Sequence, residues 1–131
     1  WETEGTKTFL GLHSAGFPNL FIVSGPQGGG GSFNFTDAID AHADYIVWML
    51  ETLRSRGARV VDVRPEPELE YAEHCRQADV ATAPLRDCLS YYNGHGEAEP
   101  GSLAYYGGNR WHKWRREAQE TLAPYLFVYG E

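Results

Sequence analysis

The sequence has few cysteines, no long apolar run and no pattern typical of a signal peptide. Its 131 residues include two cysteines, Cys75 and Cys88, too few for the disulfide framework of a small secreted domain. No apolar run approaches the roughly 20 residues that cross a bilayer. These absences predict a reduced, cytoplasmic setting and no membrane partner.

Positive charge is also scarce. The net charge of −7 comes from Asp and Glu scattered along the chain, and the basic residues gather only between Arg110 and Arg116. A nucleic-acid surface needs more positive charge, so we expect no nucleic-acid partner. Because Trp111 and Trp114 recur there at helical spacing, the cluster favours a packing edge with a solvated basic face over a nucleotide platform.

Patterns of metal ligands and nucleophiles are missing as well. The sequence contains no Cys-x-x-Cys, no His-x-x-x-His and no Gly-x-Ser-x-Gly string. We therefore expect no metal site and assign no catalytic residue. His42 lies beside the apolar stripe of a predicted helix, which is typical of a hydrogen-bonded core histidine.

The periodicity of the apolar residues predicts an α/β chain, mostly helical with a few short strands. Short runs bounded by turn residues predict strands at Thr8–Leu12, Leu20–Ser24, Arg59–Val63 and Tyr125–Tyr129. The run from Leu20 is apolar at successive positions, which indicates an interior strand covered on both faces.

Three helices are expected between these strands. The first has Ser32, Asn34 or Thr36 as its N-cap and ends near Arg56, before Gly57. The others are predicted from Pro65 to Thr82 and from Asn109 to Leu122. Their apolar stripes are expected at Ile39, Ala43, Ile46, Leu50 and Leu53 in the first helix and at Leu69, Ala72, Cys75 and Ala78 or Asp79 in the second.

A run of four glycines, Gly28 to Gly31, precedes the first helix. Ordering such a run costs much backbone entropy, and its backbone can approach a bound anion or ring closely. The lysine of a phosphate-binding loop and the acidic residue of a dinucleotide fingerprint are absent. Taken alone, the run fits either a ligand-binding loop or a flexible or engineered glycine linker.

The residues around this run resemble a known enzyme family. The string Gly11-Leu-His-Ser-Ala-Gly-Phe-Pro-Asn-Leu-Phe21, followed by Gly25-Pro26, Asn34, Ile39 and His42, resembles the C-terminal part of Baeyer–Villiger monooxygenases. Members of that family use FAD, NADPH and O2 to convert ketones into esters or lactones. The resemblance covers essentially the whole chain.

The resemblance implies which residues surround the flavin and the ketone. Cofactor contacts are implied for Gly25, Pro26, Asn34, Phe35, Thr36 and Tyr91. Substrate contacts are implied for Gly30, Gly31, Ser32 and Phe35. The chain departs from the family in two places, because Tyr91 stands where many relatives have a tryptophan that meets NADP, and the glycines replace larger residues. Smaller residues imply a roomier pocket, suited to bulky or cyclic ketones.

The resemblance also implies a division of the chain. Residues 1–57 correspond to the end of the FAD-binding domain, with a strand, the glycine loop and a long helix, and residues 58–131 to C-terminal helices, a mobile loop and a terminal strand. The dinucleotide fingerprints, the family signature and the arginine that stabilises the flavin peroxide lie upstream. We therefore expect the chain to need an upstream FAD- and NADP-binding part, in the same polypeptide or a companion chain, and to be inactive alone.

Two alternatives to this interpretation stay open. One is a standalone, non-enzymatic module that reuses the segment to bind a ligand or partner. The other keeps the flavin chemistry but places the chain in a related N-hydroxylating or sulfur-oxidising monooxygenase.

Overall fold

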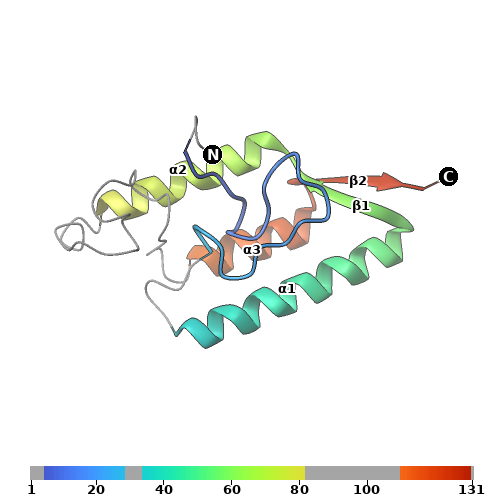
Figure 1. Cartoon of the computed structure of the whole chain (residues 1–131), viewed down its shortest axis with the longest axis horizontal. Helices are drawn as coiled ribbons and strands as arrows, with labels where there is room; N and C mark the ends of the chain where they lie inside the picture. Colours follow the sequence, from blue (N-terminus) through green and yellow to red (C-terminus); the bar gives the residue numbers. More distant parts are fainter. Residues whose placement is uncertain (1–4, 29–33, 82–109, 131) are drawn as a thin grey trace.

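The computed structural model describes residues 5–28, 34–81 and 110–130, and only the backbone of residues 79–81. Within these ranges it contains helices α1 (Phe35–Arg56), α2 (Pro65–Ala81) and α3 (Arg110–Thr121) and strands β1 (Ala58–Val63) and β2 (Tyr125–Tyr129). In the view of Figure 1, residues 5–28 cross in front of the space between α1 and α2. None of the described helices is long and apolar enough to cross a membrane.

Helix α1 forms where the sequence predicts it. Of the three candidate N-caps, Asn34 is the one used, and its side chain accepts a hydrogen bond from the Thr36 N–H. At the other end Gly57 adopts a left-handed conformation, and its N–H donates to the carbonyls of Arg54 and Leu53. Asp37 in the first turn and arginines in the last turn match the helix dipole.

The buried face of α1 differs from the predicted stripe by about one position. The buried residues are Ala38, His42, Tyr45, Met49 and Leu53. Of the predicted stripe, Ala43 is exposed and Leu50 is 53% exposed. The prediction is confirmed for Leu53 and wrong for Ala43 and Leu50, because the apolar pattern gives no weight to His42 and Tyr45, whose polar tips find buried partners.

Helix α2 begins at Pro65 as predicted and is described to Ala81. Its buried residues include Glu68, Tyr71, Cys75 and Ala78, whereas Leu69 is 49% exposed, contrary to the predicted stripe. Glu68 accepts the Ala15 N–H at 2.8 Å. Burial raises the pKa of this carboxyl, although the Ala15 bond opposes the shift.

Two of the four predicted strands form a sheet. β1 and β2 pair antiparallel, with Val61 opposite Phe127 and Val63 opposite Tyr125. The register is irregular between Ala58 and Val60.

The other two predicted strands are wrong. Within Thr8–Leu12 the chain makes a tight turn with positive φ at Leu10 and Gly11, closed by an isolated bridge from Phe9 to His13. The Leu20–Ser24 segment is flanked by positive φ at Asn19 and ends with positive φ at Ser24 itself. Its Ile22 N–H reaches the Leu12 carbonyl at 2.8 Å. An interior strand needs a neighbour on each side, and no strand pairs with this segment in the described part of the chain.

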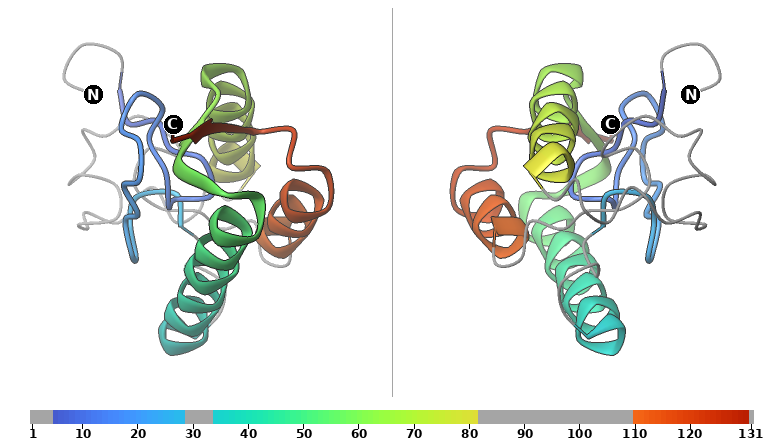
Figure 2. Two further views of the ribbon diagram at one scale, coloured as in Figure 1. Left: turned by 90° about the vertical axis from the view of Figure 1, so that its right-hand side faces the viewer. Right: turned by 90° about the vertical axis from the view of Figure 1, so that its left-hand side faces the viewer.

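All three helices contact the N-terminal segment, residues 5–28. The two views in Figure 2 place this segment on one side of α1 and α2, with α3 on the other side. The Trp111 indole N–H of α3 donates to the Leu10 carbonyl at 2.9 Å, and the Tyr71 hydroxyl of α2 donates to the Gln27 carbonyl at 2.7 Å. Trp111 is fully buried. The basic, aromatic cluster is therefore a packing edge, as predicted.

A buried chain of polar groups joins three distant segments. The His13 Nε2 lies 2.9 Å from the Tyr45 hydroxyl, which lies 2.6 Å from the Tyr125 hydroxyl. All three residues are buried. Burial raises the pKa of both tyrosines, so they remain neutral donors and acceptors. The chain thus ties the N-terminal segment, α1 and β2 together inside the core.

Removing one hydroxyl from this chain should destabilise the fold. We expect Tyr125→Phe to lower the free energy of unfolding by about 1–3 kcal/mol, because the buried Tyr45 hydroxyl loses a partner. Tyr129→Phe on the same strand is the control, since Tyr129 is 53% exposed. Urea denaturation measures both. Equal losses would contradict a special role for the buried hydroxyl.

The buried His13 should also make stability depend on pH. Burial lowers its pKa from 6.5 to about 4, so the unfolded state binds the proton more readily. The stabilising contribution of His13 is complete above its unfolded-state pKa of 6.5. It is lost as the pH falls from there through the folded-state pKa of about 4. The full loss is about 3 kcal/mol.

Urea denaturation between neutral pH and about pH 4 measures this dependence. His13→Gln, which has no titrating ring, should show a shallower decline over the same range. Parallel pH profiles for the two proteins would argue against the assignment.

Candidate functional site

The residues implied as cofactor contacts lie in two described segments: the loop Ser24–Gly28 and the first turn of α1. Gly25 and Pro26 are half-buried, whereas Asn34, Phe35 and Thr36 are exposed. Four further predicted contacts, Gly30, Gly31, Ser32 and Tyr91, lie outside the described residues.

Gln27 fixes the loop from the side of the N-terminal segment. Its side chain is fully buried and its backbone has a φ of 64°. The Gln27 Oε1 accepts the Thr8 N–H at 3.0 Å and lies 2.7 Å from the Thr8 hydroxyl, while its Nε2 donates to the Thr6 carbonyl. The sequence did not predict that Gln27 is buried, because a glutamine beside a glycine run is typical of an exposed polar position.

Two backbone segments touch at Gly11 and Gly28. A Cβ on Gly11 would lie 2.0 Å from the Gly28 Cα and 2.8 Å from the Gln27 carbonyl carbon. A Cβ on Gly25 would lie 2.6 Å from Ile22 Cγ2 and 2.7 Å from the Gly11 carbonyl oxygen. Only glycine permits these approaches. In the described residues, the close backbone approach at Gly28 is therefore to another turn of the same chain.

His42 holds the loop from the side of α1. Its Nδ1 accepts the Ser24 N–H at 3.2 Å, and its Nε2 donates to the Gly28 carbonyl at 2.8 Å. Its ring packs against the Trp111 ring with 5.2 Å between centroids. Burial lowers the pKa of His42, and the Gly28 bond partly opposes this. The prediction of a hydrogen-bonded core histidine is confirmed.

The first turn of α1 presents polar and aromatic groups beside this loop. The Asn34 Oδ1 accepts from both the N–H and the hydroxyl of Thr36, at 3.1 and 2.8 Å. Among the described residues the Asn34 Nδ2 has no hydrogen-bond partner, so it can donate to a bound group. Phe35 is 58% exposed. The turn thus offers an amide donor and an aromatic face.

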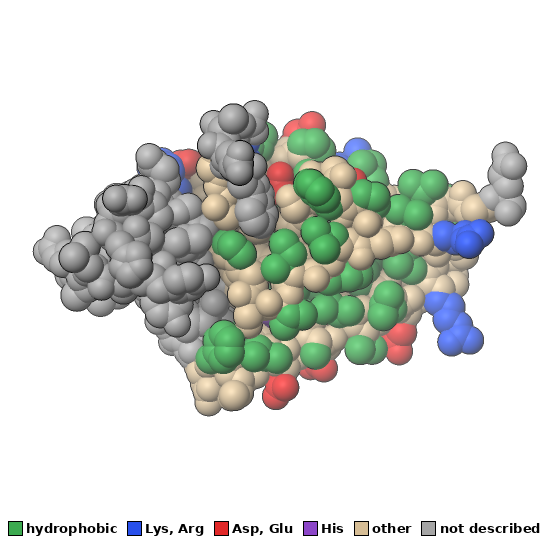
Figure 3. All heavy atoms as spheres, viewed as in Figure 1, with side chains coloured by type: hydrophobic (Ala, Val, Ile, Leu, Met, Phe, Trp, Pro, Cys, Tyr) green, Lys and Arg blue, Asp and Glu red, His purple; other side chains and the backbone are tan. Residues whose placement is uncertain are grey.

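Apolar side chains gather on the same side of the molecule. Figure 3 shows them over the N-terminal segment and along α1. The exposed ones include Phe17, Leu20 and Val23 in the segment and Phe35, Val47 and Leu50 on α1. A hollow of about 380 Å³ in the N-terminal segment is lined by Ser14, Phe17, Leu20 and Ile22. We call its apolar lining, Phe17, Leu20 and Ile22, the apolar face. A surface of this kind is typical of an interface.

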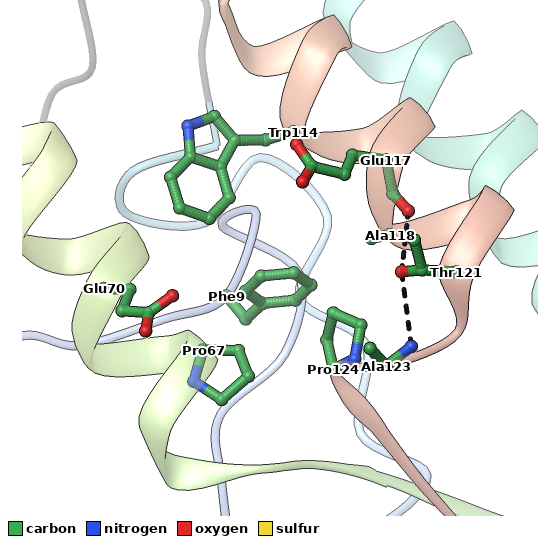
Figure 4. Close-up of a pocket in the computed structure, with 9 residues that line it drawn as sticks. All are labelled: Phe9, Pro67, Glu70, Trp114, Glu117, Ala118, Thr121, Ala123 and Pro124. Carbon is green, nitrogen blue, oxygen red and sulfur yellow. Dashed lines mark hydrogen bonds between the residues drawn. The ribbon is translucent and has the colours of Figure 1, made fainter.

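A separate hollow of about 250 Å³ lies between α2 and α3. Figure 4 shows the Phe9 ring at its centre, the Trp114 ring above, and two prolines below. The carboxylates of Glu70 and Glu117 line opposite sides. None of the implied flavin or ketone contacts lines this hollow, so it is not part of the candidate site.

The described residues contain no group of three or more side chains suited to a metal ion. Cys75 is buried, and burial raises the pKa of its thiol to about 12, so it is a protonated core residue at neutral pH.

Comparison with known proteins relates the chain to a family. No protein-family model matches the chain. Over 132 residues the chain is 33% identical to a Baeyer–Villiger monooxygenase of Streptomyces coelicolor, a match that covers 95% of this chain and 22% of that protein. A solved structure of an oxidised steroid monooxygenase bound to NADP has a TM-score of 0.80 at 26% identity, over 96% of this chain and 24% of that one. In sequence and in fold, the chain corresponds to a segment of the Baeyer–Villiger monooxygenases.

The same fold recurs at lower sequence identity. A solved structure of OTEMO in complex with FAD and NADP has a TM-score of 0.79 at 19% identity, over 96% of this chain and 23% of that one. The chain thus spans about a fifth to a quarter of the length of these proteins. The family resemblance and the mostly helical α/β fold class predicted from the sequence are confirmed.

The contact between Gly11 and Gly28 gives a direct test of the site's architecture. We expect Gly11→Ala to lower the free energy of unfolding by about 3 kcal/mol or more, because its Cβ would overlap the Gly28 backbone. Gly16→Ala is the control, since Gly16 also has a positive φ but nothing lies within 4 Å of an added Cβ. That variant should lose only about 1–2 kcal/mol. Similar losses in urea denaturation would show that conformation, not the close approach, requires glycine.

Proposed function

We propose that the chain is part of an FAD- and NADPH-dependent monooxygenase that inserts one oxygen atom from O2 into a ketone. The balanced reaction consumes a ketone, O2, NADPH and a proton, and yields an ester or lactone, NADP⁺ and water. The 33% identity to a Baeyer–Villiger monooxygenase over 95% of the chain carries this proposal. The enzyme as a whole is proposed to act in the cytoplasm.

The described residues fit contact with a flat, polar ring system. The half-buried backbone of Gly25 and Pro26 would form one edge of the flavin site. The Thr8 hydroxyl donates to the Pro26 carbonyl, and the flanking Ser24 and Gln27 are bonded to α1 and α2. The Asn34 Nδ2, which has no hydrogen-bond partner among the described residues, would donate to the ring, and Thr36 would keep the amide in place. When bound, FAD would supply the redox chemistry that activates O2, while these residues would orient the ring and limit access of water.

The ketone is proposed to meet the N-terminal end of α1. Phe35, exposed at the first position of the helix, would face the ketone together with Gly30, Gly31 and Ser32. Tyr91 is proposed to contact NADP. Because glycines in that run leave more room than larger residues would, we propose bulky or cyclic ketones as substrates.

The apolar face supports the proposal that an upstream part of the protein packs against this chain. Residues 1–57 are proposed to complete the FAD-binding domain, and residues 58–131 to form the helices and strand that follow it. In an isolated chain its exposed residues Phe17 and Leu20 would lie in water. An upstream FAD- and NADP-binding part that covers them would remove this cost.

Joining the chain to such an upstream part tests the proposal. The joined protein should retain a flavin absorbance band after gel filtration and oxidise NADPH in a ketone-dependent way, whereas the chain alone should do neither. The reason is that the dinucleotide-binding sites and the fixed cation for the flavin lie outside this chain. Gas chromatography of ester or lactone products from a panel of small and bulky ketones measures the reaction.

Two outcomes would contradict the proposal. A joined protein that oxidises NADPH but oxygenates neither ketones nor sulfides would remove the monooxygenase assignment. A chain that binds a partner through the apolar face without any flavoprotein attached would favour the standalone binding module.

A further inference from the structure

We infer that His42 is a positioning residue for the flavin-facing loop. By holding the Ser24 N–H and the Gly28 carbonyl at once, its ring sets the backbone on which Gly25 and Pro26 lie. This inference rests on the proposed function, because it assumes that the loop meets the flavin.

The two hydrogen bonds bracket the loop. Ser24 and Gly28 are the first and last residues of the described loop, and both bond to the same ring, at 3.2 and 2.8 Å. A turn between Gly25 and Gly28 closes the loop further, because the Gly28 N–H donates to the Gly25 carbonyl at 3.1 Å. The ring therefore fixes the distance between the loop's two ends.

Only one form of the ring can make both bonds. The backbone N–H of Ser24 needs a lone pair on Nδ1, and the Gly28 carbonyl needs a hydrogen on Nε2. That form is the neutral ring with its hydrogen on Nε2. A side chain that merely filled the same volume would make neither bond.

The position of the ring is itself fixed. The Trp111 ring packs against it, and the Trp111 N–H is held by the Leu10 carbonyl. A Cβ on Gly28 would lie 3.0 Å from His42 Cε1, so the backbone already rests against the ring. A shift of the ring would therefore move the loop.

The fold should survive the loss of His42. The Tyr71 hydroxyl and the Thr8 backbone still hold Gln27 from the other side. His42→Leu, which keeps similar volume but makes no hydrogen bond, should loosen the loop without unfolding the protein. His42→Gln is the conservative variant, because its amide can accept from one backbone group and donate to the other.

The test uses the chain joined to its upstream flavoprotein part. Hydrogen exchange followed by mass spectrometry reports on residues 24–28 without flavin, and equilibrium dialysis gives the Kd for FAD. We expect His42→Leu to speed exchange in residues 24–28 and to raise the Kd for FAD, each about tenfold, the effect of losing one or two hydrogen bonds. His42→Gln should recover most of both effects.

Met49→Ala is the matched control. Met49 is fully buried on the same face of α1, and its truncation removes core packing but none of the hydrogen bonds that hold residues 24–28. It should leave the Kd for FAD and the exchange of residues 24–28 unchanged.

The outcomes separate this inference from the proposed function. If the unsubstituted joined protein binds FAD and His42→Leu binds it equally well, the inference is overturned and the proposed function stands. Unchanged exchange in residues 24–28 would overturn it as well. If the unsubstituted joined protein binds no FAD, the proposed function fails and the inference falls with it.

Discussion

The contact between two backbone turns, at Gly11 and Gly28, is the constraint on which the rest of the structure depends. The two turns touch without intervening side chains, so each helix can reach a backbone carbonyl at their junction. Trp111 of α3 reaches Leu10, Tyr71 of α2 reaches Gln27, and His42 of α1 reaches Gly28. Three large side chains thereby satisfy polar groups that would otherwise be buried without partners. The helices are arranged around this junction rather than around a sheet.

The helices could be predicted from sequence because their signals are local. A cap residue at Asn34, a glycine at position 57 and prolines at the start of α2 act within one turn of the chain. The buried stripes were harder to predict, because Tyr45 and Tyr71 are buried through hydrogen bonds to residues far away in sequence. The prediction of a strand at Leu20–Ser24 was wrong for a related reason. Strand formation depends on neighbouring strands, which the propensities of the residues do not reveal.

The candidate site shows the same limit. The glycine-rich segment, its proximity to a helix N-terminus and the core position of the histidine could be predicted from the sequence. The partners of that histidine were not, because nothing in the sequence relates Ser24 and Gly28 to position 42. Gln27 was missed altogether, although its side chain is among the most buried in the described chain. Polar residues that fix a loop look identical, in sequence, to polar residues that face solvent.

The hydrogen bonds that close the core have a consequence for biosynthesis. The bond from Trp111 to Leu10 spans 101 positions, and the one between Tyr45 and Tyr125 spans 80. The N-terminal segment therefore leaves the ribosome well before its partners exist. It cannot reach its final packing until β2 has been synthesised. Until then, its apolar residues must be shielded from water by contacts other than the final ones. A ribosome that stalled before Tyr125 would hold a nascent chain whose Tyr45 hydroxyl still lacks this partner.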